Sequence, residues 1–235
     1  MKWSWVWVLG FYFLFGMAVA ANGQTLFSDN FNRTGSNLGP NWAAVVGSFS
    51  ADGTQAVSQT AQNWSKMKVP LGTDDYQVEA IIIPPAASHY SGLVIRGDAN
   101  LFYQDLYAAQ IDVVVQKINL YRRNAGAWTL LKSAAAPGGI VAGGSYKLGV
   151  KVSGNNPVNL EVFFQGALLF TYIDSGANRI VSAAPGIQNY NSGVKVDNFI
   201  VSSLGAPANQ PPVNSSPAFR ASPITTPMSG TTTSV

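Results

Sequence analysis

The sequence predicts an all-β domain built as a sandwich of two antiparallel sheets, and three observations lead to this prediction. Between residues 24 and 204, short runs rich in β-branched and aromatic residues alternate with clusters of Gly, Pro, Asn and Ser. No stretch keeps a helical period of apolar residues over three turns. Several runs alternate apolar with polar residues, so we expect one face of each strand to be buried and the other to be wet.

The expected strands follow one another at short intervals along the chain. In order they are Leu26–Phe31, Tyr76–Ile83, Ser91–Gly97, Leu106–Val114, Ile118–Arg123, Ala127–Lys132, Tyr146–Gly154, Val158–Gly166 and Lys195–Ser203. The segments RNAGAW and SGNNPV are typical of hairpin connections between neighbouring strands. Alternation places Leu148, Val150 and Val152 on the buried side of one strand, and Ile118 and Leu120 on the buried side of another.

The tripeptide Asp-Asn-Phe occurs twice, once in each terminal strand. In a jelly-roll sandwich the first and last strands commonly run antiparallel beside each other, which brings the termini together. We therefore expect Phe31 and Phe199 to be core or cross-strand aromatics. Asp29 and Asp197 are then expected near the same rim of the sandwich.

The two ends of the chain differ in composition from the predicted sandwich at 24–204. Residues 1–20 join a short basic start to a long apolar run that closes on the small-x-small pattern AVA, which predicts a cleaved signal peptide. An uncleaved membrane anchor is the alternative. Pro, Ser, Thr and Ala dominate residues 205–235, so this tail is predicted to be a disordered linker or stalk, with a further module beyond it as an additional expectation. Both readings give an exported protein, secreted or on the cell surface, and after signal-peptide cleavage no membrane contact is expected.

The composition argues against several kinds of chemistry. The chain has no cysteine, and therefore no disulfide, thiolate nucleophile or cysteine-bound metal. The formal charge is +3, and the basic residues are scattered, with Arg122-Arg123 the one adjacent pair. We expect that pair at a solvated hairpin end. A nucleic-acid partner is not expected, because no stripe of Lys and Arg could neutralise a row of phosphates.

Three motifs follow one another in order over residues 26–204. They are the opening Asp-x-Phe, a Gly-Leu-x-x-Arg strand at Gly92–Arg96, and a closing Gly-x-x-x-Asp-x-Phe at Gly193–Phe199. This order resembles that of exported concanavalin A-like lectin and glucanase sandwiches, close to laminin-G-like and three-keto-disaccharide-hydrolase-like domains. The resemblance implies a curved jelly-roll sandwich whose concave face or rim binds carbohydrate outside the cell.

The sequence lacks the paired acids that glycosidases use. Its two glutamates, Glu79 and Glu161, lie on different predicted strands, and neither has a second acid two or four residues further on. Asp74-Asp75 precede a strand, in a turn where solvated side chains are expected. The single histidine, His89, stands in a loop, and no nucleophile elbow is available to complete a triad. We therefore predict that the protein is not an enzyme, with a glycoside hydrolase of the same fold as the alternative.

Sugars present apolar C–H faces and rings of hydroxyl groups, which proteins bind with aromatic rings and polar side chains. The residues predicted for this role are Arg96, Gln110, Tyr121, Trp128, Asn189 and Tyr190. The predicted function is a non-catalytic, lectin-like module that recognises an extracellular polysaccharide or glycoconjugate. A structural or adhesive surface module that binds protein is a further alternative.

These candidate residues also have structural interpretations. Arg96 could form a cross-strand pair with an acid, for which Asp98, Asp112 and Glu79 are available. Tyr121 and Trp128 could pack across strands. Two other tryptophans, Trp42 and Trp64, are expected in the core or as lid residues and are left out of the predicted site.

A structural Ca²⁺ is the one cofactor considered. The resemblance implies it, because related sandwiches often hold calcium at a sheet rim, where carboxylates and carbonyl oxygens are the ligands. Asp29 and Asp197, on paired terminal strands, would supply the charged ligands. The alternative is that these two aspartates cap turns or pair with Arg33 or Lys195.

Overall fold

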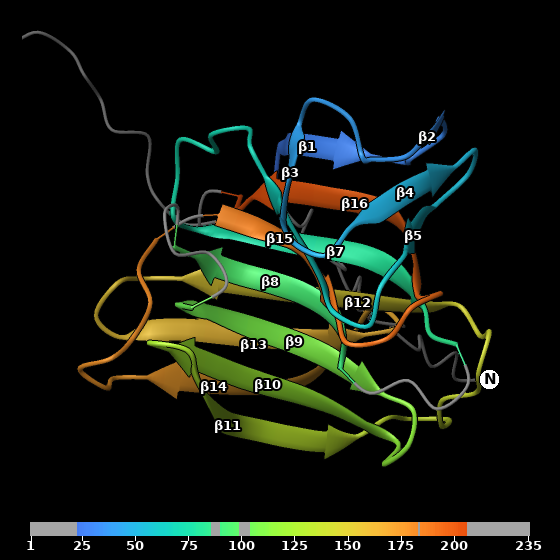
Figure 1. The fold of residues 1–235 in the computed structure, drawn as a ribbon. Helices are drawn as coiled ribbons and strands as arrows, with labels where there is room; N and C mark the ends of the chain where they lie inside the picture. The colour runs from blue at the N-terminus through green and yellow to red at the C-terminus, as the bar shows by residue number, and fades with distance from the viewer. Residues whose placement is uncertain (1–22, 86–89, 99–103, 183, 206–235) are drawn as a thin grey trace, which may run out of the picture.

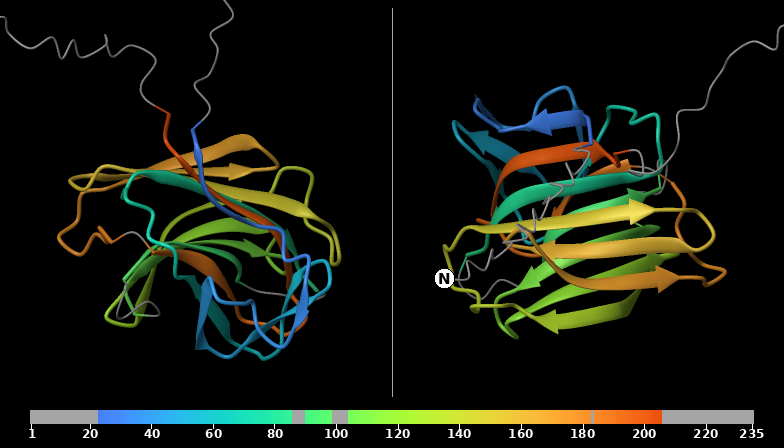
Figure 2. Two further views of the ribbon diagram at one scale, coloured as in Figure 1. Left: turned by 90° about the horizontal axis from the view of Figure 1, so that it is seen from above. Right: turned by 180° about the vertical axis from the view of Figure 1, so that it is seen from behind.

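The computed structural model is an antiparallel β-sandwich, as the sequence predicts (Figures 1 and 2). The residues that the structure describes are 23–85, 90–98, 104–182 and 184–205. They form sixteen strands and no α-helix. Among them, no helix is long and apolar enough to cross a membrane. The predicted signal peptide, His89 and the tail from residue 206 lie outside the described residues.

The larger sheet has nine strands within the described residues. Its order is β14 (Ala167–Asp174), β13 (Val158–Phe164), β12 (Tyr146–Ser153), β7 (Tyr76–Ile83), β16 (Lys195–Ser203), β5 (Ala56–Ser58), β4 (Phe49–Asp52) and β2 (Thr34–Gly35), with β1 (Thr25–Asp29) paired to β16. The second sheet has seven strands, in the order β11 (Ala127–Ala135), β10 (Lys117–Asn124), β9 (Leu106–Asp112), β8 (Ser91–Gly97), β15 (Ala184–Asn189), β6 (Asn63–Met67) and β3 (Trp42–Val46). The right-hand view of Figure 2 looks onto the nine-stranded sheet, and Figure 1 looks onto the seven-stranded one.

Each strand predicted from the sequence is present. The predicted hairpin between β10 and β11 turns through Ala125 and Gly126, which both have positive φ, at 47° and 83°. The predicted facing also holds, because Leu148, Val150 and Val152 are all buried in the core between the sheets. The sequence did not reveal the strands between residues 34 and 67, nor β14 and β15. Several of these are very short, and β15 has the sequence APGIQN, in which Pro and Gly obscure a strand pattern.

The two terminal strands meet, as the repeated tripeptide predicts. Strand β1 runs antiparallel to β16, and Asp29 lies directly opposite Phe199. Both Phe31 and Phe199 are fully buried, and both pack on the indole of Trp42, whose centroid lies 5.6 Å and 5.0 Å from the two phenyl rings. Aromatic pairs of this geometry contribute about 0.5–1.5 kcal/mol each beyond the burial of their area. Trp42 is thus a core residue that helps to close the sandwich at its termini.

Asp29 is the polar centre of this aromatic cluster. Its carboxylate accepts two hydrogen bonds from the Arg33 guanidinium, at 2.7 and 2.8 Å, one from Trp42 Nε1 at 2.7 Å, and one from the backbone N–H of Phe31 at 2.8 Å. Burial alone would raise the pKa of Asp29, but the hydrogen bonds from Arg33, Trp42 and Phe31 outweigh burial and hold the pKa below its ordinary value. The alternative in which Asp29 pairs with Arg33 is therefore the one that the structure supports.

The two aspartates do not fit a calcium site. The Asp29 carboxylate is already surrounded by donors, one of them the cationic guanidinium of Arg33, which would repel a second cation. Asp197 accepts hydrogen bonds from the backbone and side-chain nitrogens of its neighbour Asn198. Among the described residues, no group of three or more His, Asp or Glu side chains could hold a metal ion. Both carboxylates are therefore engaged within the protein, and calcium at this rim stays a prediction from the sequence.

The lowered pKa of Asp29 predicts an acid-dependent loss of stability. Ionised Asp29 stabilises the fold above the unfolded-state pKa, and this contribution disappears as the pH falls through the lower folded-state pKa. At neutral pH we expect Asp29→Asn to lower the free energy of unfolding by about 1–3 kcal/mol. The difference from wild type should shrink as the pH falls through the folded-state pKa of Asp29. Urea denaturation followed by tryptophan fluorescence at several pH values measures it.

The control for this experiment is Asp197→Asn, because that carboxylate binds its own neighbour rather than an arginine. Its unfolding curve should follow the wild type closely. A stability deficit of Asp29→Asn that stays constant from neutral to acid pH would contradict the account of Asp29.

Candidate functional site

The seven-stranded sheet is buried on both of its faces along β8 and β9, where every residue is buried. The face toward the nine-stranded sheet carries core residues such as Leu93 and Ile95. The outer face was expected to be wet, but it carries an apolar cluster of its own, in which Trp64, Val94 and Ala108 are buried together. The described side chains that pack over this face, such as Trp64, Trp128 and Tyr190, belong to the same sheet and its connecting loops.

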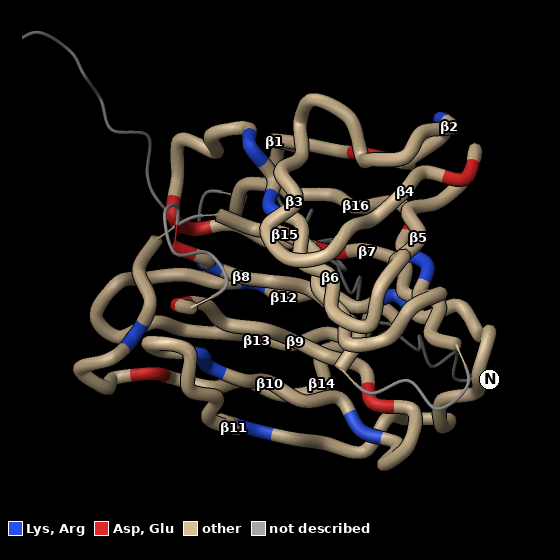
Figure 3. The backbone as a smooth tube through the Cα atoms, in the orientation of Figure 1, with Lys and Arg blue, Asp and Glu red and all other residues tan. Residues whose placement is uncertain are grey.

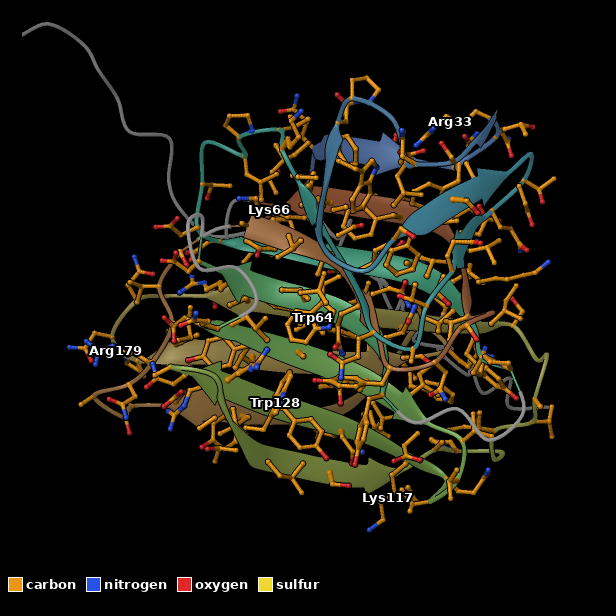
Figure 4. All side chains as sticks on the ribbon, viewed as in Figure 1. Arg33, Trp64, Lys66, Lys117, Trp128 and Arg179 are labelled. Atoms are coloured by element: carbon orange, nitrogen blue, oxygen red, sulfur yellow. The ribbon has the colours of Figure 1, made fainter. Side chains whose placement is uncertain are left out.

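Five aromatic rings form a closed circuit over this outer face, and we call them the aromatic circuit. The centroid distances around it are 5.8 Å for Trp64–Trp128, 5.7 Å for Trp128–Tyr121, 6.0 Å for Tyr121–Tyr90, 5.7 Å for Tyr90–Tyr190 and 6.2 Å for Tyr190–Trp64. The interplanar angles range from 52° to 84°, so each ring presents an edge or a tilted face to the next. Two of the five, Trp64 and Trp128, are labelled in Figure 4, where they lie on the face of the seven-stranded sheet.

The circuit requires a curved sheet. Strands β6 and β11, which carry Trp64 and Trp128, are five steps apart in the strand order, or about 24 Å in a flat sheet. Their rings nevertheless lie 5.8 Å apart. The sheet must therefore bend toward its outer face, which makes that face concave and brings side chains from distant strands together.

The circuit borders a pocket of about 210 Å³ that is lined by Tyr90, Gln110, Tyr121, Trp128 and Tyr190. Burial raises the pKa of Tyr121, and the nearby Tyr90 and Asp112 raise it further, so the phenol of Tyr121 is a neutral hydrogen-bonding group at physiological pH. Gln110 is almost completely buried, and its Oε1 has no hydrogen-bond partner among the described residues. The pocket thus combines aromatic walls with an amide that has an unused acceptor.

A row of residues in register crosses the seven-stranded sheet, and their side chains belong to its outer face. The strand register gives its members in order as Trp64, Gln188, Gly92, Gln110, Asn119 and Ser133, on β6, β15, β8, β9, β10 and β11. We call this set the polar row. At one end, Ser133 Oγ donates to Asn119 Oδ1 at 2.7 Å. In the middle, the amides of Gln110 and Gln188 retain polar atoms without a partner among the described residues.

Arg123 contacts two rings of the aromatic circuit. Its guanidinium carbon lies 5.1 Å from the Trp64 ring centroid and 5.3 Å from that of Trp128, a distance typical of cation–π contacts. Its Nε donates to the carbonyl of Gly126 at 2.9 Å. The neighbouring Arg122 forms a salt bridge of 2.9 Å with the buried Asp174. The expectation of a solvated Arg122-Arg123 pair was therefore wrong, because both side chains fold back onto the sandwich.

The structure brings four of the six predicted site residues to one pocket, namely Gln110, Tyr121, Trp128 and Tyr190. Asn189 lies elsewhere, fully buried, with its Oδ1 accepting a 3.0 Å hydrogen bond from Asn63. The sequence placed Asn189 in a loop beside the last strand, but it belongs to β15, between β6 and β8. Its neighbour in the sequence, Gln188, is the one in the polar row.

Arg96 holds a structural position outside the pocket. Its side chain is fully buried and donates to Asn155 Oδ1 at 2.9 Å, to the Asp74 carbonyl at 2.8 Å and to Asp75 Oδ1 at 3.2 Å. The acids suggested as its partners from the sequence, Asp98, Asp112 and Glu79, are not the ones it pairs with. The Asp74-Asp75 turn is thus more than a solvated connection, and Arg96 lies outside the pocket.

Trp64, Tyr90, Arg123 and Gln188 were not among the predicted site residues. Trp64 lies in a five-residue strand with the sequence NWSKM, which carries too few apolar residues to be recognised. Tyr90 directly precedes β8, a strand that the sequence predicts, so its place at the start of that strand was visible in the sequence. The position of Arg123 on the outward side of its strand was visible, but its contact with two indoles depends on the curvature of the sheet.

Figure 3 shows how charge is distributed around this face. On the central strands, Arg96 and Asp112 lie near the ends of β8 and β9, and β15 carries no charged residue, whereas Lys132 lies within the edge strand β11. None of the five residues that line the pocket carries a formal charge at neutral pH. A ligand in the pocket would therefore meet aromatic surface and neutral polar groups.

No protein-family model and no curated protein sequence matches the chain. Among solved structures, it is similar to the carbohydrate-binding module CBM66 from Bacillus subtilis, with 17% identity, a TM-score of 0.57, and coverage of 69% of this chain and 96% of that one. A protein of unknown function with a galectin-like fold from Bacillus subtilis has 13% identity, a TM-score of 0.57, and coverage of 77% and 97%. The GH43 protein BlXynB from Bacillus licheniformis, solved as a mutant, has 14% identity and a TM-score of 0.52 over 75% of this chain and 39% of that one.

The chain has the concanavalin A-like jelly-roll fold. This confirms the fold that the sequence predicts. At 13–17% identity, the similarity establishes the fold alone. The function has to be argued from the pocket.

The placement of Arg96 predicts that it stabilises the fold. Replacing it with alanine removes three hydrogen bonds and leaves a buried cavity, so we expect Arg96→Ala to lower the free energy of unfolding by about 2–5 kcal/mol. Thermal and urea unfolding measure this loss. The control is Arg179→Ala, whose guanidinium is bonded at an exposed site and should matter by less than about 0.5 kcal/mol. An Arg96→Ala protein as stable as the control would contradict this role.

Proposed function

We propose that the protein is a non-catalytic carbohydrate-binding module that recognises an extracellular polysaccharide or glycoconjugate. One observation carries the proposal: a closed circuit of five aromatic rings borders a small pocket above a row of amide side chains on a concave sheet. The similarity of fold to a carbohydrate-binding module and to a galectin-like protein is consistent with it.

The chemistry of the pocket suits an uncharged sugar. Aromatic rings such as Tyr121 and Trp128 offer flat apolar surface to the C–H face of a sugar ring. The Gln110 amide and the tyrosine hydroxyls can each donate to or accept from hydroxyl groups. The volume of about 210 Å³ lies below the range of drug-sized sites, so we propose that one sugar ring occupies the pocket at a time.

The positions of the glutamates favour binding without hydrolysis. Glu79 and Glu161 belong to β7 and β13 of the nine-stranded sheet, and each is paired with a lysine, Lys147 at 2.7 Å and Lys151 at 2.9 Å. The five side chains that line the pocket include no carboxylate. A glycosidase would need two acids placed on either side of the scissile bond. We therefore propose that the protein holds a glycan and leaves it intact.

The proposal places the protein outside the cell. Its support is the amino-terminal apolar run that ends in a small-x-small pattern, as expected of a signal peptide. A glycan-binding module on the cell surface or in the medium would meet polysaccharides directly. The Pro-, Ser- and Thr-rich tail would then serve as a spacer between this module and its attachment.

A binding assay tests the proposal. The wild type should bind at least one neutral oligosaccharide from a panel of xylo-, arabino-, cello-, manno-, galacto- and malto-trioses, and it should bind the acidic trigalacturonate more weakly. Tyr121→Ala and Trp128→Ala should each weaken binding by about 5- to 150-fold, because each removes one aromatic wall worth about 1–3 kcal/mol. Isothermal titration calorimetry measures the affinities, and chromatography of the ligand afterwards should find it uncleaved.

The matched control is Phe163→Ala, which removes an aromatic ring from the outer face of the nine-stranded sheet. This variant should bind as the wild type does. If no member of the panel binds to the folded wild-type protein, or if Phe163→Ala loses binding as much as Tyr121→Ala, the proposed site is wrong.

A further inference from the structure

The polar row continues beyond the pocket to Gln188, which does not line it. Gln188 is 1% exposed, and neither its Nε2 nor its Oε1 has a hydrogen-bond partner among the described residues. Gln110, two strands away in the same row, is also 1% exposed and has an unpartnered Oε1. Buried polar atoms in folded proteins nearly always have partners. Three such atoms in one row therefore call for a polar partner that the described residues do not supply, such as a ligand in the neighbouring pocket.

Gly92 separates the two glutamines and leaves the space between them free of a side chain. The strand register places it directly between Gln188 on β15 and Gln110 on β9. A Cβ atom at this position would lie 2.0 Å from the carbonyl oxygen of Ala109, so the pairing of β8 with β9 requires glycine here. Two strand spacings separate the backbones of the glutamines by about 10 Å, and their side chains can approach one another across this gap.

We infer that Gln110 and Gln188 form a paired-amide subsite that binds neighbouring hydroxyl groups of a single uncharged sugar ring. This inference rests on the proposed function and specifies the class of ligand. Each amide offers a carbonyl acceptor and two N–H donors, and each hydroxyl can donate and accept, so two amides match a pair of vicinal hydroxyls. Neither amide carries a charge, so the pair itself offers no counter-charge to a carboxylate or sulfate group. The nearby guanidinium of Arg123 is engaged by the rings of Trp64 and Trp128 and by the Gly126 carbonyl. The ligand class is therefore a neutral pentose or hexose with adjacent free hydroxyls.

Access to Gln188 requires a change of side-chain conformation. Trp64 is its direct neighbour in the polar row, and the Trp64 ring contacts the ring of Tyr190 at a centroid distance of 6.2 Å. Tyr190 in turn lines the pocket. A rotamer change of Tyr190, or of the flexible Gln188 side chain itself, brings the amide to the pocket, and changes of this size commonly accompany binding.

The variant Gln188→Met tests the subsite, because methionine keeps the length and shape of glutamine and removes its polar atoms. The full chain is titrated calorimetrically with the same six neutral trisaccharides. We expect binding at least tenfold weaker than that of the wild type. The thermal unfolding midpoint should be unchanged or higher, since an unpartnered buried amide is replaced by an apolar group of similar shape. Gln110→Met should give the same combination of weaker binding and retained stability.

The control is Gln77→Met on β7, a strand glutamine of the nine-stranded sheet whose Nε2 donates to Glu79 at 3.3 Å. It should bind as the wild type does. Equal binding by the wild type and Gln188→Met overturns the paired-amide subsite and leaves the proposed function standing. A lowered unfolding midpoint, or a failure of Gln188→Met to fold, assigns Gln188 a structural role and also overturns it. A wild type that binds none of the trisaccharides overturns the proposed function, and this inference with it.

Discussion

The central strands of the seven-stranded sheet, β8 and β9, are buried on both faces, and the candidate site depends on this burial. A sandwich needs only the inner face of each sheet to be apolar, and its outer faces can remain wet. Here β8 and β9 are buried at every residue, although the described residues form only two sheets. The cover is made of aromatic side chains that bend over the outer face, and they can meet because the sheet is curved. The curvature, the circuit and the pocket are therefore one feature.

The closure of the aromatic circuit has consequences for rigidity. Each of its five rings contacts two others, and Arg123 lies between the two indoles, so the walls of the pocket are held by one another as well as by the backbone. Side chains that are already ordered lose little conformational entropy when a ligand binds. The polar row beneath them has the opposite character, because its central amides are buried without partners. Ordered aromatic rings beside amides without partners favour a ligand that has both C–H and hydroxyl surfaces.

Much of the fold could be predicted from the sequence, because its main signals are local. Alternation over 146–153 and 158–164 identified strands and their buried sides, and the repeated Asp-Asn-Phe correctly predicted that β1 and β16 pair. What could not be predicted depends on distant contacts. The pairing of Arg96 with the 74–75 turn, the place of Gln188 in a short Pro- and Gly-containing strand, and the meeting of Trp64 with Trp128 all follow from topology and curvature. Aromatic and amide residues were recognised as candidates by type, and their assembly into one pocket required the strand order.

The central claim is that glycans bind on the concave face of the seven-stranded sheet. A two-dimensional NMR titration with a neutral trisaccharide that binds tests this most directly. It follows the backbone amide signals and the indole N–H signals. The account predicts shifts that cluster at Tyr90, Gln110, Tyr121, Gln188 and the indole of Trp128, with the outer face of β7, β12 and β13 unchanged. Shifts that cluster around Glu79, Lys151 and Phe163 on the nine-stranded sheet instead would contradict it.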